Sequence, residues 1–278
     1  MKIVFIGSDM RMQYACDYIS RCGYDASIIS FNNDSAVDHD RVIKTVHASD
    51  VIVLPAPVSN DGINIRGTES KSGSLKIADV IENVKSNSVV FAGKLSEALI
   101  KKINYINYLE DEEYLLDSAY LTAEGTLGHL LSEYPKALAK SSIVLTGWGR
   151  IAKYLYKQLE SYTKNITVVL RNQETAKKLI ADNISVRDFS YPDKAIKQCD
   201  ILINTVPAGV ITRETLSKLD KDTYIIDLAS LPGGVDFDAA KEFGITCKHL
   251  LALPGKCAPV SAGYSLGKCL HNRINNLL

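Results

Sequence analysis

The segment SSIVLTGWGRIAKYL, residues 141–155, decides the fold of the second half of the chain. An apolar run leads directly into the turn GWGRIA at 147–152, and an amphipathic stretch follows. Strand, glycine turn and helix in this order are typical of a dinucleotide-binding βαβ unit. Gly147 permits a tight turn, Gly149 lets the backbone approach a pyrophosphate, and the small Ala152 lets the helix pack closely on the sheet. The alternative is a glycine turn without a ligand.

The residues after the next expected strand favour NADP over NAD. An NAD site usually carries an acidic residue there, which binds the ribose hydroxyls. This chain has Arg171 and Asn172 instead. A guanidinium can bind a 2′-phosphate through two parallel hydrogen bonds, and Asn172 and Thr175 add neutral donors. The alternative is a solvated arginine at the end of a strand.

Two later strands end in polar and small residues that are expected at the same sheet edge. Asn204 and Ser230 could bind the carboxamide of a nicotinamide, and Lys256 could hold a substrate anion. The predicted cofactor-binding residues are Gly147, Trp148, Gly149, Arg150, Ile151, Arg171, Asn172, Asn204, Thr205, Val206 and Pro207.

Short apolar runs alternate with amphipathic stretches of helical length in two blocks, which predicts two doubly wound parallel-sheet α/β domains, the second a Rossmann NAD(P)-binding domain. The expected strands are Lys2–Ile6, Ala26–Ser30, Val51–Leu54, Ser88–Phe91 and Asn104–Asn107, then Ile143–Thr146, Ile166–Leu170, Ile184–Arg187, Ile201–Asn204, Tyr224–Asp227 and Thr246–Leu250. The expected helices of the first block are Met10–Cys22, Asp40–His47, Leu75–Val84 and Ser96–Lys102.

The domain boundaries follow from these blocks. We expect a substrate domain at 1–121, joined by a C-terminal helix at 261–278, a linking segment at 122–140 with a helix from Thr122 to Tyr134, and the Rossmann domain at 141–260. The stretch Pro55–Gly73 is rich in proline, glycine and serine and is too long for a routine connection, so it is a candidate functional loop.

The opening turn of the first domain, GSDMR at 7–11, differs from a dinucleotide turn. Asp9 stands at the position of the second glycine, and its charge would repel a phosphate. Arg11, near the start of a helix, suits a carboxylate instead and points to a substrate domain. The competing interpretation is an ordinary N-cap Asp9 with Arg11 on the surface.

Composition excludes several classes of function. The 32 basic and 32 acidic residues cancel, which disfavours nucleic-acid binding. No apolar run reaches the roughly 18 residues of a membrane span. The six cysteines are scattered without metal-ligand spacing, so we expect reduced thiols, no metal site and a cytoplasmic protein.

Seven motifs extend in order over nearly the whole chain, and together they resemble the A subunit of dipicolinate synthase from endospore-forming bacteria. One departure is Val260-Ser261, where the family usually has Lys-Thr. The motifs are GSDMR (7–11), LTAEG (121–125), LTGWGRIAK (145–153), RN (171–172), DILINTVPAGV (200–210), IIDLASLPGGVDF (225–237) and LALPGKCAPVSAG (251–263).

The resemblance implies a cyclic dicarboxylate substrate, 4-hydroxy-tetrahydrodipicolinate or its dehydrated form, and dipicolinate as product. It also implies NADP as hydride acceptor, expression in the mother cell during sporulation, and a partner, the flavoprotein-like B subunit of dipicolinate synthase. We further expect a homo-oligomer.

Two ring carboxylates need cationic partners, and Arg11 and Lys256 are expected on opposite sides of a cleft. Glu124, expected at the start of the linking helix, is the candidate acid or base, although a first-turn glutamate could merely favour the helix dipole. The predicted catalytic residues are Glu124 and Lys256, and the predicted substrate-binding residues are Asp9, Arg11, Thr122 and Ser230.

Two other functions remain open at this point. One is an NADP-dependent carbonyl reductase of shikimate dehydrogenase type, which would be expected to use a Lys–Asp pair. The other is a non-catalytic NADP-binding protein that regulates a partner.

Overall fold

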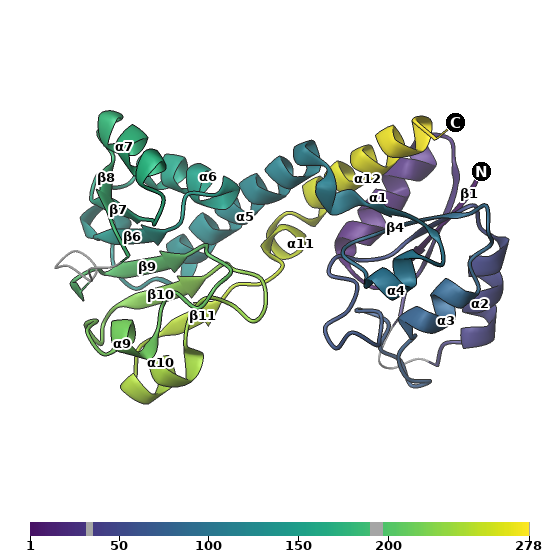
Figure 1. Cartoon of the computed structure of the whole chain (residues 1–278), viewed down its shortest axis with the longest axis horizontal. Coiled ribbons are helices and arrows are strands. Elements are labelled where there is room, and N and C mark those ends of the chain that lie inside the picture. Colours follow the sequence, from purple (N-terminus) through teal and green to yellow (C-terminus); the bar gives the residue numbers. More distant parts are fainter. Residues whose placement is uncertain (32–35, 190–196, 278) are drawn as a thin grey trace. The chain divides into compact units, whose positions relative to one another are not determined.

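The computed structural model describes residues 1–31, 36–189 and 197–277, which form two α/β units (Figure 1). Unit 1 comprises Met1–Ser118 with Pro254–Leu278, and unit 2 comprises Ala119–Leu253. The chain passes from one unit to the other within helix α5 (Glu112–Glu133) and returns after Leu253. The sequence predicts these two boundaries a few residues later, at residues 121 and 260.

Helix α5 corrects the expected linking helix, because it begins at Glu112 rather than at Thr122. The Asp111 side chain accepts a hydrogen bond from the Tyr114 backbone N–H at 3.0 Å, as an N-cap does, and Glu112 and Glu113 place negative charge in the first turn. The helix ends at Glu133, shortly before Pro135.

Unit 1 contains a five-stranded parallel sheet in the order β2-β1-β3-β4-β5, so the expectation of a doubly wound domain is confirmed. Its topological switch point lies between β1 and β3. The strands are β1 (Lys2–Ile6), β2 (Asp25–Ile29), β3 (Val51–Val53), β4 (Val89–Ala92) and β5 (Asn104–Asn107). The helices include α1 (Met10–Arg21), α2 (His39–Ala48), α3 (Ile77–Glu82), α4 (Glu97–Ile100) and α12 (Pro259–Asn275).

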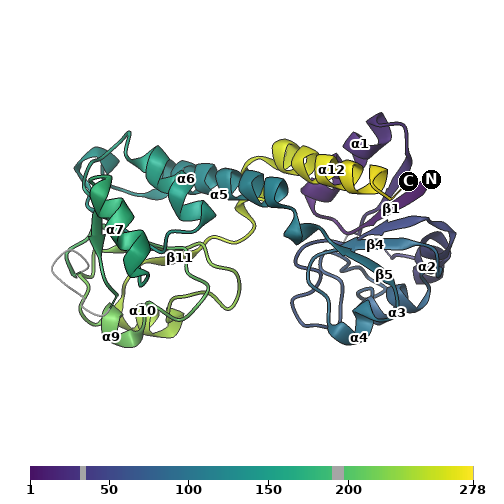
Figure 2. The same ribbon diagram turned by 45° about the horizontal axis from the view of Figure 1, so that its top comes forward.

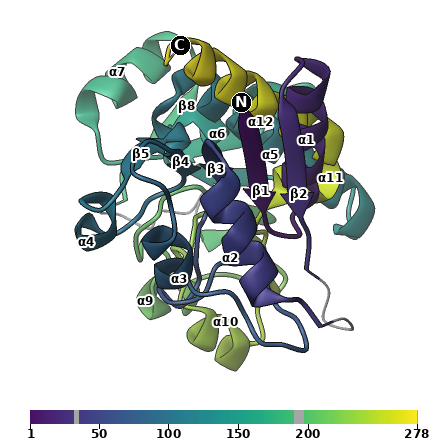
Figure 3. The same cartoon turned by 90° about the vertical axis from the view of Figure 1, so that its right-hand side faces the viewer.

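Alternate residues of β1 serve the two faces of this sheet. Ile3 and Phe5 pack in the cluster that contains residues of α1 and α12, whereas Val4 and Ile6 pack in the cluster that contains residues of α2 and α3. Figure 3 shows the two pairs of helices on either side of the strands. Helix α12 lies along α1 (Figure 2), and Gly267 permits this approach because a Cβ there would lie 2.7 Å from the Cβ of Tyr18. The C-terminal helix is therefore an integral part of unit 1.

Unit 2 contains a six-stranded parallel sheet in the order β11-β10-β9-β6-β7-β8. This is the Rossmann order, with the switch point between β6 and β9. The strands are β6 (Ile143–Thr146), β7 (Ile166–Val169), β8 (Ser185–Arg187), β9 (Ile201–Asn204), β10 (Tyr224–Asp227) and β11 (Cys247–His249). The helices include α6 (Arg150–Leu159), α7 (Gln173–Ala181), α9 (Arg213–Leu216) and α10 (Phe237–Phe243).

In the part of the chain that the structure describes, no helix combines the length and apolar character needed to cross a membrane. The same residues contain no cluster of three or more histidine, cysteine or acidic side chains suited to a metal ion.

We predict that Cys22 and Cys257 alone react quickly with a thiol reagent at mildly alkaline pH, because these two are exposed. Burial raises the pKa of Cys16 to about 11 and that of Cys199 and Cys269 to about 12. Titration with a chromogenic disulfide, before and after unfolding in urea, compares the thiols that react in the folded protein with those that react only after unfolding. Rapid reaction of Cys199 in the folded protein would contradict the expected order.

The same burial makes stability pH-dependent at the alkaline end. A thiol whose pKa is raised by folding contributes stability that is complete below the ordinary thiol pKa and disappears as the pH rises toward the raised value. The urea concentration at the unfolding midpoint should therefore decrease as the pH rises from about 9 to about 12.

Candidate functional site

A cavity of about 270 Å³ lies in unit 2 at the carboxyl ends of strands β6, β7 and β9. Parallel α/β sheets bind ligands at this edge. The structure thus brings together the predicted glycine turn, the residues after β7 and the residues after β9. The lining residues are Gly147, Trp148, Leu170, Arg171, Asn172, Thr175, Phe189, Val206 and Val210.

The glycine turn has the geometry that a pyrophosphate needs. Gly147 has a φ of +86°, and a Cβ there would lie 2.8 Å from the Oγ1 of Thr205. Gly149 is the N-cap of α6 and supplies no capping side chain, and the first turn of α6 contains no acidic residue. A Cβ on Gly149 would meet nothing within 4 Å. The positive end of α6 therefore faces open space next to the turn.

Arg171 stacks on an aromatic ring in the cavity wall. Its guanidinium carbon lies 5.5 Å from the ring centroid of Phe189, a residue that was not predicted from the sequence. Asn172 is the N-cap of α7, and its Oδ1 accepts a hydrogen bond from the Thr175 N–H at 2.8 Å. None of the nine described residues that line the cavity is acidic.

Asn204 has a different role from the expected contact with a carboxamide. It is fully buried, and its Oδ1 accepts hydrogen bonds from the Thr146 Oγ1 at 2.6 Å and the Val206 N–H at 3.1 Å. Its Nδ2 donates to the Val206 carbonyl at 3.0 Å and to the Asp227 Oδ1 at 2.8 Å. Because these contacts saturate the amide, Asn204 positions the residues after β9 and has no capacity left for a ligand.

Asp227 is the centre of this buried network and was not predicted from the sequence. Its Oδ1 also accepts from the Ala229 N–H at 3.0 Å, and its Oδ2 accepts from the Gly234 N–H at 2.7 Å. The only available signal was an acidic residue at the end of an apolar strand, which is too common to single it out. The carboxylate fixes the turn after β10 next to that after β9.

The remaining predicted residues of unit 2 lie around these turns. Thr205 donates through its Oγ1 to the Thr146 carbonyl at 2.7 Å, and Val206 lines the cavity. Exposed positions are Arg150, Pro207 and Ser230, and Ile151 is half-buried in the first turn of α6.

A compact charged cluster lies at the carboxyl end of β1 in unit 1. Asp9 is the N-cap of α1 and accepts from the Arg11 N–H at 2.9 Å, as one of the two sequence interpretations held. Arg11 is not on the surface, since its side chain is only 12% exposed and pairs with Asp9 at 2.5 Å. Arg66, from the predicted functional loop, contacts the same Asp9 carboxylate at 3.3 Å.

The charges of this cluster outweigh the effect of burial on Asp9. Burial alone would raise the pKa of Asp9, but its hydrogen bonds to Arg11 and the positive charges of Arg11 and Arg66 hold that pKa below its ordinary value. Asp9 is therefore an anion at neutral pH and cannot itself attract a carboxylate.

Lys256 and Glu124 lie elsewhere than expected. Lys256 is exposed in the short helix α11 (Leu253–Cys257). It follows Gly255, whose Cβ would lie 3.2 Å from the Nε of Arg11, so Lys256 belongs to the same unit as Arg11. Glu124 is exposed in the middle of α5 rather than at its start, and Thr122, in the same helix, is half-buried.

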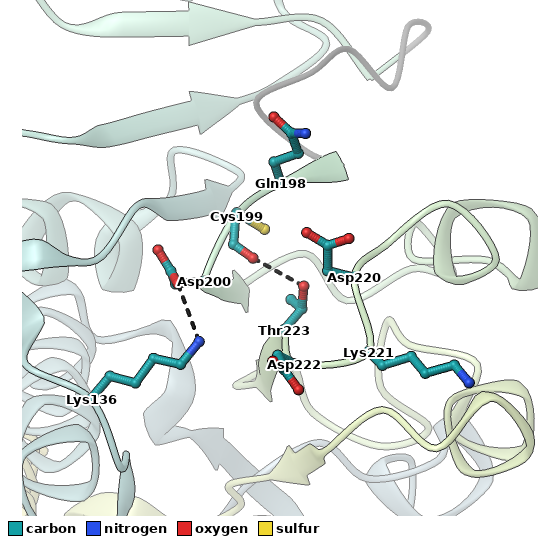
Figure 4. A pocket seen from close by; sticks show the side chains of 8 residues that line it. All are labelled: Lys136, Gln198, Cys199, Asp200, Asp220, Lys221, Asp222 and Thr223. Atoms are coloured by element: carbon teal, nitrogen blue, oxygen red, sulfur yellow. Dashed lines mark hydrogen bonds and ion pairs between the residues drawn. The ribbon is translucent and has the colours of Figure 1, made fainter.

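A second cavity, of about 330 Å³, lies at the amino ends of β9 and β10 (Figure 4). Its charged lining includes Lys136, which pairs with Asp200 at 3.5 Å. Dinucleotides bind at the opposite edge of such a sheet, so this cavity is not the candidate site.

Comparison with known proteins gives two family matches. Residues 2–108 match the N-terminal domain of the dipicolinate synthase A subunit. Residues 129–247 match the shikimate/quinate 5-dehydrogenase family. The chain is also 24% identical to the A subunit of dipicolinate synthase from Bacillus subtilis (strain 168), over 97% of this chain and 94% of that protein. The resemblance to the dipicolinate synthase A subunit is confirmed.

Solved structures agree on the fold. The crystal structure of the dipicolinate synthase A subunit from Bacillus halodurans superposes with a TM-score of 0.87 at 24% identity, over 98% of each chain. A transhydrogenase from Sinorhizobium meliloti superposes with a TM-score of 0.67 at 16% identity, over 99% of this chain and 94% of that one. The two-domain, dehydrogenase-like architecture is thus common to this chain and to the A subunit of dipicolinate synthase.

Proposed function

We propose that this protein is an NADP-dependent oxidoreductase, the A subunit of a dipicolinate synthase. The observation that carries the proposal is the cavity of unit 2. This cavity combines a glycine turn at a helix N-terminus with Arg171, and none of its described lining residues is acidic. These residues fit a dinucleotide with a 2′-phosphate.

Each part of the cavity has a distinct role in this proposal. The turn from Gly147 to Gly149 and the first N–H groups of α6 bind the pyrophosphate. Arg171 binds the 2′-phosphate, and its stacking on Phe189 holds the guanidinium at the adenosine side. When bound, the nicotinamide accepts a hydride.

The proposed reaction converts a cyclic dicarboxylate to dipicolinate. Dihydrodipicolinate loses one hydride to NADP and one proton to a base, and the ring becomes aromatic. If 4-hydroxy-tetrahydrodipicolinate is the substrate, it loses water first. Glu124 remains the predicted acid or base, Lys256 the second predicted catalytic residue, and Thr122 and Ser230 predicted substrate contacts. The similarity to the dipicolinate synthase A subunit further supports the B subunit as a partner. We also propose a homo-oligomer that acts in the cytoplasm of the mother cell during sporulation.

We predict that Arg171→Ala weakens binding of NADPH by about 10- to 100-fold and leaves binding of NADH nearly unchanged, because only the 2′-phosphate loses its charged hydrogen bonds. Trp148 is the chain's single tryptophan and lines the cavity, so its fluorescence reports binding directly. Arg213→Ala is a matched control, since Arg213 also stacks on a phenylalanine at 5.5 Å but lies outside the cavity. Equal losses for both coenzymes would contradict the assignment of NADP.

Activity distinguishes the proposal from its alternatives. The purified chain, with and without the B subunit, is mixed with NADP and freshly made dihydrodipicolinate, and NADPH absorbance and dipicolinate are followed. Product from the chain on its own places the chemistry in this protein, and product only with the B subunit supports the regulatory alternative. The match to shikimate/quinate 5-dehydrogenase favours a second candidate, carbonyl reduction, which is tested with NADPH and shikimate-type ketones.

A further inference from the structure

We propose that Arg66, rather than Arg11, is the residue of unit 1 that binds a carboxylate group of the substrate, and that Asp9 and Arg11 position it. The inference rests on the proposed function for the identity of the substrate. It assigns a role to the loop Pro55–Gly73, which the sequence marked as functional without naming a residue in it.

Arg11 has little capacity left for a ligand. Its Nε donates to both oxygens of Asp9 at 3.1 Å, and its Nη2 donates to Asp9 at 2.5 Å and to the Ala56 carbonyl at 3.3 Å. Gly255 packs against the aliphatic part of Arg11. A guanidinium has five N–H donors, and most of those on Arg11 are directed into the protein. Arg11 is therefore a structural cation that holds Asp9.

Arg66 has the opposite character. Its side chain is 25% exposed, and its guanidinium makes one ion pair within the described residues, a 3.3 Å interaction of Nη2 with the Asp9 Oδ2. That contact leaves most of its N–H donors available to an anion. A planar guanidinium presents paired donors that match the two oxygens of a carboxylate.

The backbone around Arg66 is held in place by several hydrogen bonds. The Arg66 N–H donates to the Val58 carbonyl at 2.8 Å, and the Ser8 N–H donates to the Gly67 carbonyl at 3.0 Å. The bond to Val58 holds the Arg66 backbone within the loop, and the bond from Ser8 joins the loop to the turn after β1, where the Arg66 guanidinium contacts Asp9.

The location agrees with a ligand site in this type of sheet. The turn after β1 and the segment after β3 flank the switch point of unit 1, where open α/β sheets bind their ligands. The Asp9 carboxylate already caps the N-terminus of α1. An incoming anion must consequently be bound by a side-chain cation, and the cluster of Arg11, Arg66 and Asp9 has a net charge of about +1.

The test measures binding of dipicolinate and of NADPH separately, by titration calorimetry on the full chain. Arg66→Gln should weaken binding of dipicolinate by about 10- to 100-fold and should leave binding of NADPH unchanged. Arg66→Lys should recover part of the loss, because it keeps the charge without the paired donors. Arg21→Gln, which removes an exposed unit 1 arginine paired with Asp17 at 3.0 Å, is the control and should bind both ligands normally.

The outcomes separate this inference from the proposed function. Normal binding of dipicolinate by a folded Arg66→Gln variant overturns the role of Arg66 and leaves the dinucleotide site intact. Wild-type protein that binds NADPH but no dipicolinate also overturns it. Wild-type protein that binds dipicolinate but no NADPH overturns the proposed function and not this inference. If Arg66→Gln does not fold, Arg66→Lys provides the decisive comparison. The paired-donor contact would be overturned if the Arg66→Lys variant bound dipicolinate with wild-type affinity and also bound pyridine-2-carboxylate, which has a single carboxylate, equally well.

Discussion

Gly149→Val should abolish dinucleotide binding and leave the fold intact. The φ of −79° at Gly149 is ordinary for any residue, and a Cβ there meets no other atom of the chain within 4 Å. The valine therefore fits the free protein and occupies only the space in which we place the pyrophosphate. Loss of two charge-assisted N–H contacts corresponds to about 3–5 kcal/mol, or more than 100-fold in the dissociation constant.

Gly128→Val is the matched control for this change. Gly128 is exposed in α5, and its Cβ position is equally open. Valine has a better helix propensity than glycine, so the control should fold at least as well as the wild type and should bind NADPH normally. The measurement is quenching of Trp148 fluorescence, with the thermal midpoint as the check on folding. Wild-type affinity in a folded Gly149→Val protein would show that the turn does not hold a pyrophosphate.

The fold was predictable because both sheets are buried and parallel, which gives continuous apolar runs at regular intervals. Strands such as Ile143–Thr146 and Ile201–Asn204 were predicted at their observed bounds. The start of α5 was missed although two sequence signals mark it: Asp111 is a residue type that caps helices, and Glu112 and Glu113 are the acidic residues typical of a first turn. The helical turn at α11 was not predicted, because proline and glycine within five residues are untypical of a helix.

The candidate site was predictable where backbone conformation determines the residue. Gly147 and Gly149 follow from the turn itself, and Arg171 follows from its place after β7. Asn204 was misassigned because sequence gives the position of an amide but not the partners that saturate it. Arg66 could not be singled out, since its proximity to Asp9 comes from the path of a long loop, and no local pattern encodes that contact.

Asp227→Asn should destabilise unit 2 by about 2–4 kcal/mol, because it places an NH₂ group where a buried carboxylate now accepts three hydrogen bonds. An asparagine can keep the two donors on Oδ1, from the Asn204 side chain and the Ala229 N–H. Its Nδ2 would then face the Gly234 N–H, and two donors would meet with no acceptor. Relaxation is restricted, since Gly233 and Gly234 pack directly against this network.

Urea unfolding with Asp222→Asn as control measures the cost. Asp222 lies in the turn that precedes the same strand at its other end and is exposed, so its replacement should change the free energy of unfolding by no more than about 0.5 kcal/mol. Asp227 holds Asn204, and Asn204 in turn fixes Val206 in the cavity wall. The Asp227→Asn protein should therefore also bind NADPH more weakly at urea concentrations below its unfolding transition. Equal stability of the two variants would mean that the carboxylate is dispensable and that the other contacts of Asn204, together with the hydrogen bond from Thr205 to Thr146, hold the turn after β9.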